Sequence, residues 1–480
     1  MRWGNSAAGQ TTERLRVGAE LSGQSRLSSR AHLPSHRRML GFTKNLTISI
    51  SSAYAVASSI FQQQPVFFMK SPATKTVLIL GLGHPRQEPF LRSLHQGGMN
   101  VYAAHVDRKE KRRSRFLAGF FQLPNDEMGQ LEALEKFGLE HGPNIFLVAS
   151  NDEYIALVSQ NRESLSRHFN IPLPGWDIVR RMMDRREASR IAGELGISIP
   201  KTWEIKSEAE MLRTIEELDT ENFDHILKTL SVLSEPADEG GLRQTKPAPR
   251  DKQAMVAMCH DIQRRTGAFP LIQQVIPGQA DAAVGVTMLV GPDEKIELSY
   301  CVQRLRLTTY QLAGAYVHPY VLGSVVWCQT VHDEEAVEKA RALVAAFRYT
   351  GLAVIEFRRH LTTNELFLMK VEPRPVRATA LATAIGMDIP TAMYAAFNEQ
   401  PVEVADDYSD GVQWLYIQGC LESLFNNDVR NRRDLLRLLL RMPKMRAFAE
   451  DLKDPVPLIA GAAKLAFRRI RRKQPLTAHR

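Results

Sequence analysis

Cysteine is scarce in this chain. It occurs four times among 480 residues, and no two cysteines form a C-x-x-C pair. Widely spaced single cysteines supply neither the ligand cluster of a zinc site nor the disulfide framework of a small secreted domain. The sequence therefore predicts a cytoplasmic protein, in a reducing compartment, without structural disulfides at Cys259, Cys301, Cys328 or Cys420.

The folded part of the chain also lacks an excess of charge of one sign. The net charge is +9, but residues 1–72 hold nine Lys or Arg against Glu13 and Glu20 and thus account for +7 of it. A basic patch on a folded face is what a nucleic-acid-binding protein needs. We therefore expect no nucleic acid partner.

Residues 1–72 show no sustained hydrophobic period and are rich in Ser, Arg, Gln and Gly, so we expect a disordered basic extension. The uncharged run 45–69 is diluted by Ser, Thr and three consecutive Gln, which argues against a membrane-spanning helix. The favoured interpretation is an extended start ahead of Met69. An organelle transit peptide and a secretory signal are the alternatives.

From Thr76 onward the pattern becomes α/β. Strands are expected over 77–80, 101–105 and 145–149, with a helix over 87–96 and another capped by residues 150–153. This predicts a Rossmann-like domain over 73–180. Gly81 and Gly83 imitate a dinucleotide fingerprint, but Arg86 stands at the third glycine position, so a structural turn is favoured over an oxidoreductase site.

A hairpin expected over 352–372 carries the most informative pattern. Side chains alternate across a strand, so Lys370 and Glu372 share a face, and the hairpin brings that face close to Glu356. Opposed carboxylates suit Mg2+, and the guanidinium of Arg374 suits phosphate oxygens. We therefore predict Glu356 and Glu372 as metal ligands and Lys370 and Arg374 as catalytic groups.

This hairpin resembles the last part of the ATP-grasp fold, where a Glu on one strand and Glu-x-Asn-x-Arg on the next hold magnesium and ATP. The following segment, RPVRATALATAIGMDIP, is similar to that of carbamoyl-phosphate-synthetase-like and D-aspartate-ligase-like carboxylate–amine ligases. Two positions depart from the signature, because Lys370 replaces a glutamate and Glu372 an asparagine. The resemblance implies an α/β protein with an ATP-grasp domain over 181–400 after the Rossmann-like one.

The resemblance also implies further site residues. Arg185 stands where the family has a phosphate-binding lysine, and Lys228 corresponds to a lysine over the α- and β-phosphates. A loop is expected over 234–252, and by resemblance its glycines Gly240 and Gly241 would close over the phosphates. The segment PLIQQVIPG resembles the hinge whose main chain binds adenine, and Arg304 would face the transferred phosphoryl group or an acidic substrate. The hinge and ribose candidates are Gln273, Gln274, Val275, Ile276 and Asp281.

The region 401–480 is expected to be helical. Its basic end, around 458–473, suits either a helix packed on the body or weak contact with an anionic membrane surface. By resemblance, the chain uses ATP and Mg2+ to join a small carboxylate to an amine. A non-catalytic ATP-binding descendant is the alternative, because Arg185, Lys370 and Glu372 all depart from the family pattern.

Overall fold

A computed structural model describes residues 75–81, 87–106, 114–228, 245–307, 325–375, 378–417, 419–420, 445 and 447–448. The predicted extension over 1–72, the glycines Gly240 and Gly241, and most of the basic C-terminal region lie outside these residues. None of the helices in the described ranges combines the length and the apolar character needed to cross a bilayer.

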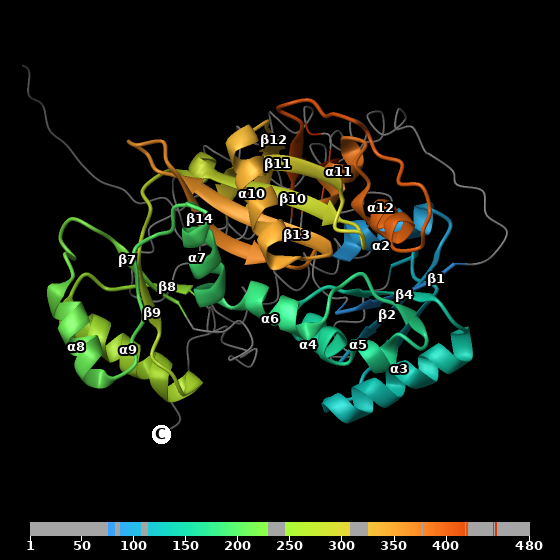
Figure 1. Ribbon diagram of the computed structural model, residues 1–480, viewed down its shortest axis with the longest axis horizontal. Helices are drawn as coiled ribbons and strands as arrows, with labels where there is room; N and C mark the ends of the chain where they lie inside the picture. Colours follow the sequence, from blue (N-terminus) through green and yellow to red (C-terminus); the bar gives the residue numbers. More distant parts are fainter. Residues whose placement is uncertain are drawn as a thin grey trace, which may run out of the picture. The chain divides into compact units, whose positions relative to one another are not determined.

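The first sheet is parallel and has the strand order β3-β2-β1-β4-β5 (Figure 1). Its strands are β1 (Thr76–Leu80), β2 (Asn100–His105), β3 (Gly119–Gln122), β4 (Ile145–Ala149) and β5 (Phe169–Asn170). Helices α2 (Gln87–Gln96), α3 (Glu127–His141), α4 (Asp152–Gln160) and α5 (Arg162–Leu165) connect them. Strand β4 is buried at every residue, as expected of a parallel strand covered on both faces. The predicted strands and helices of this region are confirmed.

The largest sheet has the order β14-β13-β10-β11-β12-β15-β16. It contains β10 (Ala283–Val290), β11 (Ile296–Leu307), β12 (Val325–Thr330), β13 (Gly351–Arg359) and β14 (Leu366–Glu372). Helix α10 (Glu334–Phe347) packs on β10, β11 and β13 (Figure 1). The predicted hairpin is therefore present as β13 and β14, within one residue of the expected bounds.

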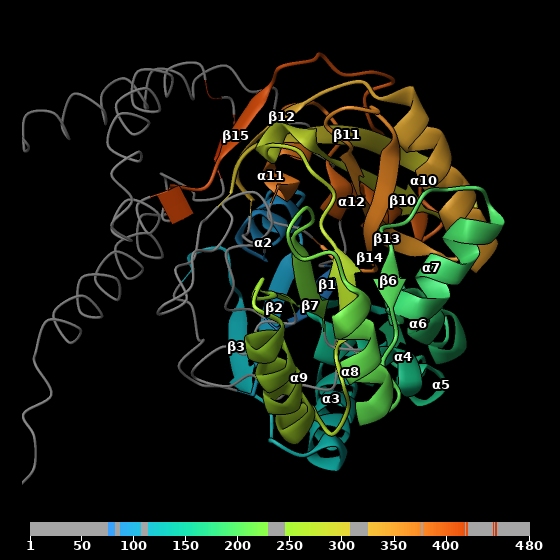
Figure 2. The ribbon, with the colours of Figure 1, turned by 90° about the vertical axis from the view of Figure 1, so that its left-hand side faces the viewer.

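A four-stranded antiparallel sheet follows the helices α6 (Trp176–Met183) and α7 (Arg185–Glu194). Its order is β6 (Thr202–Trp203), β9 (Leu271–Gln274), β7 (His225–Lys228) and β8 (Thr245–Pro247). Helices α8 (Glu208–Glu217) and α9 (Lys252–Thr266) lie side by side (Figure 2) and bury their apolar faces with Leu227 and Ile272 of this sheet. The loop predicted over 234–252 is wrong at its end, because β8 pairs with β7 there.

The C-terminal prediction is wrong over most of the described residues, because 401–416 contain no helix and 447–448 form a strand, whereas 417, 419 and 420 are helical. Trp414 belongs to a strand, β15 (Gln413–Leu415), which pairs with β12, and β16 (Ala447–Phe448) pairs with β15. Trp414 is fully buried, so packing at the edge of the large sheet overrides the local preference. Helices α11 (Thr379–Ala384) and α12 (Ile389–Ala396) precede this strand.

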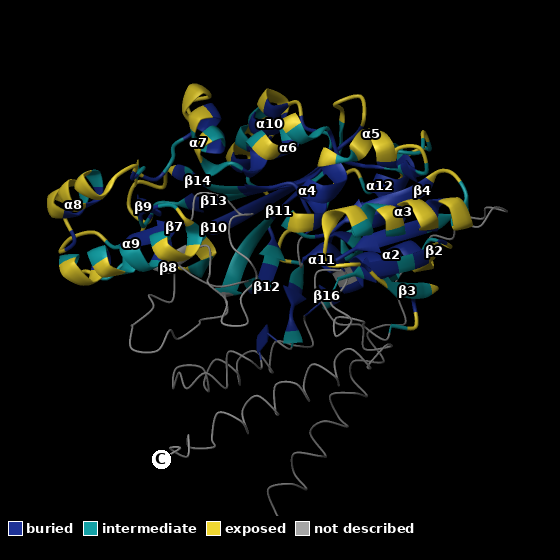
Figure 3. Ribbon diagram, turned by 90° about the horizontal axis from the view of Figure 1, so that it is seen from below, coloured by how far each residue is buried: buried dark blue, intermediate teal, exposed yellow. Residues whose placement is uncertain are grey.

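One hydrophobic core joins the parallel sheet to the large sheet. It includes Leu78 and Leu147 from the first and Val286, Ile355 and Leu368 from the second. Strands β4, β10 and β13 are largely buried, while α3, α8 and α9 each expose one face (Figure 3). This shared core fixes the carboxyl ends of β1 and β4 relative to the β13–β14 hairpin. The candidate site described below draws residues from both regions.

Candidate active site

The β13–β14 hairpin brings the predicted charged residues together. Glu356 lies opposite Lys370 in the register of the two strands, and Val354 lies opposite Glu372. Lys370 forms an ion pair with Oε1 of Glu372, two residues along the same strand. Glu356 forms an ion pair with Arg304 of β11. The expected sharing of one face by Lys370 and Glu372 is confirmed, although the two glutamates are paired with cations.

Arg374 follows β14 and is buried, with 7% of its surface exposed. Its Nη2 lies 2.5 Å from Oε1 of Glu372, and its Nε lies 2.7 Å from Oδ1 of Asp152. Asp152 is the first residue of α4. The guanidinium therefore links the end of the hairpin to a helix that follows the parallel sheet.

Sequence reasoning missed Asp152 as a site residue, because Ser-Asn-Asp-Glu at 150–153 was interpreted only as a helix cap. The cap is Asn151, whose Oδ1 accepts a hydrogen bond from the N–H of Tyr154 at 2.9 Å. A single cap residue satisfies this role. The acidic residue next to a competent Asn cap was the signal that Asp152 serves another purpose.

Lys228 is buried at the end of β7 in the same neighbourhood. Burial and the positive charges of Arg185 and Lys370 lower the pKa of Lys228 to about 7, while Glu356 opposes the shift. The positive charge of the Lys228 ammonium has too little negative charge around it, so an anion bound next to it would stabilise the charged form. Arg185, Lys228 and Lys370 come from three different elements, and the first and the last lie close enough to Lys228 to lower its pKa.

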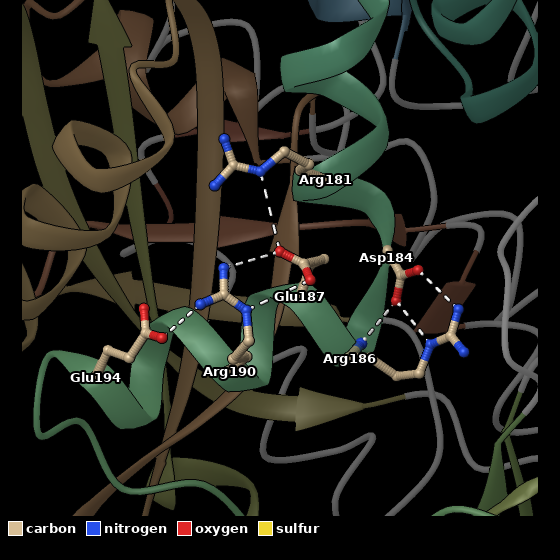
Figure 4. Close-up of polar contacts among 6 residues, drawn as sticks. All are labelled: Arg181, Asp184, Arg186, Glu187, Arg190 and Glu194. Carbon is tan, nitrogen blue, oxygen red and sulfur yellow. Dashed lines mark hydrogen bonds and ion pairs between the residues drawn. The ribbon is translucent and has the colours of Figure 1, made fainter.

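Arg185 is the first residue of α7 and follows its cap, Asp184, which Figure 4 shows in contact with Arg186. Oδ1 of Asp184 accepts from the N–H of Arg186 at 2.8 Å, and the two side chains form an ion pair. Further along the helix, Glu187 pairs with Arg190 at 3.0 Å. Arg186 also pairs with Glu204 and Glu187 with Arg181, so these charges of α7 have partners both on the helix and outside it.

The predicted hinge, PLIQQVIPG over 270–278, includes β9, and several of its main-chain groups are already bonded. The N–H of Gln274 donates to the carbonyl of Lys201 at 2.9 Å, and the N–H of Val275 donates to that of Asp224 at 2.8 Å. Oγ1 of Thr202 accepts from the buried Gln273 side chain at 2.9 Å. An adenine base bound at this hinge would use the main-chain N–H and C=O groups of the segment that are not already bonded.

Arg358 of β13 is a second residue that sequence reasoning missed. Its Nε donates to the carbonyl of Ile276 at 2.8 Å, and its Nη2 donates to the carbonyl of Gly278. Burial and the charge of Arg304 lower the pKa of Arg358, and Asp281 opposes this. Arg358 therefore holds the hinge beside the predicted ribose ligand Asp281, which lies in the 3-10 helix Ala280–Ala282.

Glu356 and Glu372 have the oxygen ligands that Mg2+ prefers, but their surroundings do not fit a metal held by the protein alone. Glu356 is paired with Arg304, and Glu372 accepts from both Lys370 and Arg374. Among the described residues, no group of three or more His, Cys, Asp or Glu has the arrangement of a metal site. Basic side chains outnumber acidic ones at this place: Arg185, Lys228, Arg304, Lys370 and Arg374 lie among Asp152, Glu356 and Glu372.

Comparison with known proteins gives one similar curated sequence. No family model matches the chain. D-aspartate ligase of Enterococcus faecium (strain Aus0004) is 20% identical over 249 residues, which cover 51% of this chain and 56% of the ligase. The match thus spans little more than half the length of that relative.

Solved structures are similar over a larger share of the chain. N5-carboxyaminoimidazole synthetase from Staphylococcus aureus, complexed with ADP, has a TM-score of 0.51 and 15% identity, covering 72% of this chain and 83% of the synthetase. The biotin carboxylase domain of the 2-oxoglutarate carboxylase from Hydrogenobacter thermophilus, complexed with MgADP, ADP and bicarbonate, has a TM-score of 0.51 and 12% identity, covering 71% and 74%. Both neighbours were solved with an adenine nucleotide.

Proposed function

We propose that this chain, which has the fold of the ATP-grasp superfamily as its sequence indicates, is an ATP-dependent carboxylate–amine ligase. The observation that carries the proposal is the buried Lys228, at the end of β7, within electrostatic reach of Arg185, Lys370 and Glu356. Three cations from separate elements, one of them buried with a lowered pKa, form a centre that a polyphosphate would stabilise. Magnesium is proposed only as the counter-ion that arrives with the nucleotide.

The proposed reaction has two steps. An oxygen of a small carboxylate attacks the γ-phosphorus of ATP, and ADP leaves, which gives an acyl phosphate. The nitrogen of an amine then attacks the acyl carbon, inorganic phosphate leaves, and the amine nitrogen loses a proton. In this scheme Arg185 and Lys228 hold phosphate oxygens, and Arg374 and Arg304 stabilise charge on the transferred group or on an acidic substrate.

Thermal unfolding with nucleotide tests the binding half of this proposal. A ligand at 100 times its Kd adds about 2.7 kcal/mol to the free energy of unfolding. ATP should therefore raise the melting temperature, and Lys228→Ala should remove most of that rise. The exposed Lys206, on the segment before α8, gives a matched control, because Lys206→Ala removes a lysine away from the cation cluster. Absence of any shift with millimolar ATP or ADP would sink the proposal.

The catalytic half is tested by ADP release. The similar D-aspartate ligase makes D-aspartate the first amine to try, within pools of L- and D-amino acids and small carboxylates. Each pool is tested with and without Mg2+. Release of ADP that requires both a carboxylate and an amine would support ligation.

A second candidate function is nucleotide binding without catalysis. It is favoured by the ion pairs that occupy Glu356 and Glu372, the two carboxylates predicted for metal. This candidate predicts a nucleotide-dependent rise in melting temperature together with no ADP release from any pool. The two experiments above therefore separate the alternatives.

A further inference from the structure

We propose that Asp152 is a positioning residue that aims the guanidinium of Arg374 at the terminal phosphoryl group of ATP. This inference rests on the proposed nucleotide-binding function and adds to it a residue from the region of the parallel sheet. Asp152 lies 222 positions away from Arg374 in the sequence, and the two side chains meet at 2.7 Å. The helix α4 would thus contribute directly to the geometry of the site.

The contacts of Arg374 fix its orientation. Nε is bonded to Asp152 and Nη2 to Glu372, so two adjacent edges of the planar guanidinium are held by two carboxylates. No contact with another described residue uses Nη1. A guanidinium offers its donors in a fixed fork, so holding two nitrogens determines where the third one points. Nη1 is then the donor that would meet an anionic ligand.

Two cations, Lys370 and Arg374, need a second carboxylate besides Glu372 to balance their charge. Oε1 of Glu372 accepts from both Lys370 and Arg374, so one carboxylate oxygen serves two cations. Arg374 and Glu372 are each only 7% exposed, and solvent compensates neither of them fully. Asp152 supplies negative charge that Glu372 cannot give to both partners. Without Asp152, Arg374 would be drawn towards Glu372 alone and would compete with Lys370.

The same helix provides a matched control. Glu153 follows Asp152 in the first turn of α4 and is exposed. Asp152→Asn and Glu153→Gln each remove one negative charge from the same helix terminus, with the same effect on the helix dipole. They differ in that Asp152 alone contacts Arg374. Asp152→Glu keeps the negative charge and tests whether a longer carboxylate restores the contact with Arg374.

The experiment measures calorimetric affinities for ADP and for the β,γ-imido analogue of ATP in the wild type and the three variants. In Asp152→Asn we expect affinity for the analogue to fall about tenfold or more, the size of one lost charge-assisted hydrogen bond, with ADP affinity within about twofold. Asp152→Glu should regain most of the loss, and Glu153→Gln should leave both affinities unchanged. Melting temperatures without ligand confirm that each variant is folded.

Several outcomes overturn this inference while leaving nucleotide binding intact. They are equal affinities of Asp152→Asn and Glu153→Gln, equal losses for ADP and the analogue in Asp152→Asn, and failure of the wild type to distinguish the two nucleotides. If the wild type binds neither nucleotide, the proposed function itself fails and this inference fails with it. The two kinds of failure are therefore distinguishable.

Discussion

Lys370 and Glu372 are ion-paired on one face of β14, where the resembled signature has a glutamate and an asparagine. The ammonium occupies the carboxylate that was predicted to hold magnesium, and Arg374 occupies the same oxygen. The Lys370 ammonium thus contacts a carboxylate that, by the signature, would contact a metal ion. We therefore expect this site to bind a metal ion more weakly than the signature would.

Restoring the signature should strengthen magnesium binding. In the double variant Lys370→Glu with Glu372→Asn, a carboxylate at 370 would lie directly opposite Glu356 in the register of the hairpin. Two opposed carboxylates suit a hard divalent cation, so we expect Mg2+ affinity in the presence of ADP to rise about tenfold or more, measured by calorimetry.

The single variant Lys370→Met is the control for this prediction. It removes the ammonium but adds no carboxylate, so it should improve Mg2+ affinity less than the double variant does. The prediction is contradicted if the wild type already binds Mg2+ as tightly as the double variant.

Gly351, the first residue of β13, is expected to tolerate no side chain. Its φ is +115°, and an added Cβ would lie 2.5 Å from the carbonyl oxygen of Pro172. Main-chain strain and this clash together should lower the free energy of unfolding by about 3 kcal/mol in Gly351→Ala, measured by denaturant unfolding.

Gly267, which ends α9, separates the clash from the strain. Its φ is +78°, and an added Cβ would meet nothing within 4 Å. Gly267→Ala should therefore cost about 1 kcal/mol, the strain of a left-handed residue alone. Equal losses in the two variants would show that the contact with Pro172 relaxes at no cost.

The hairpin could be predicted from sequence because its signal is local. Alternation around Glu356 in 352–358 and the strand-like run 366–372, with a polar turn between them, predict both strands, and the strand period of two predicts the shared face of Lys370 and Glu372. The ion pairs could not be predicted in the same way. The partner of Glu356 is Arg304 on β11, and pairing across a sheet depends on a register that sequence periodicity does not specify.

The errors have the same physical origin. Gln413–Leu415 has no periodicity of its own, and it becomes a strand because β12 offers an unpaired edge. Thr245–Pro247 becomes a strand because β7 lies beside it. Asp152 and Arg358 act through partners far along the chain, so the residues around them carry only a weak signal of their roles.

Arg358 should hold the hinge in place. In Arg358→Met the carbonyls of Ile276 and Gly278 lose their donor, and an unpaired buried carbonyl costs about 1–3 kcal/mol. We expect faster amide hydrogen exchange over 271–278 and weaker ADP binding. Arg348→Met is the control, because it removes an arginine whose side chain forms an exposed pair with Glu294, away from the hinge. Unchanged exchange over 271–278 in Arg358→Met would show that β9 alone fixes the hinge.

Lys228 should make stability and nucleotide binding depend on pH in opposite directions. With its pKa lowered from 10.5 to about 7, the folded protein lacks a proton that the unfolded chain carries between these values. Unfolding then takes up a proton, so this residue's contribution makes stability rise as pH rises from 7 towards 10.5. A bound phosphate favours the ammonium form of Lys228 and so raises its pKa. Nucleotide binding at pH 8 therefore also takes up a proton. The affinity for nucleotide then falls as the pH rises, by at most about tenfold per pH unit.

Calorimetry of ADP binding at pH 8, in buffers with different ionisation enthalpies, measures this proton directly. We expect the wild type to take up close to one proton per ADP, because burial beside Arg185 and Lys370 leaves Lys228 largely neutral before the nucleotide arrives. Lys228→Arg keeps a positive charge at every pH in this range, so it should bind ADP without the uptake. Uptake of the same size in both proteins would assign the proton to another group, and no uptake in the wild type would mean that Lys228 is already charged.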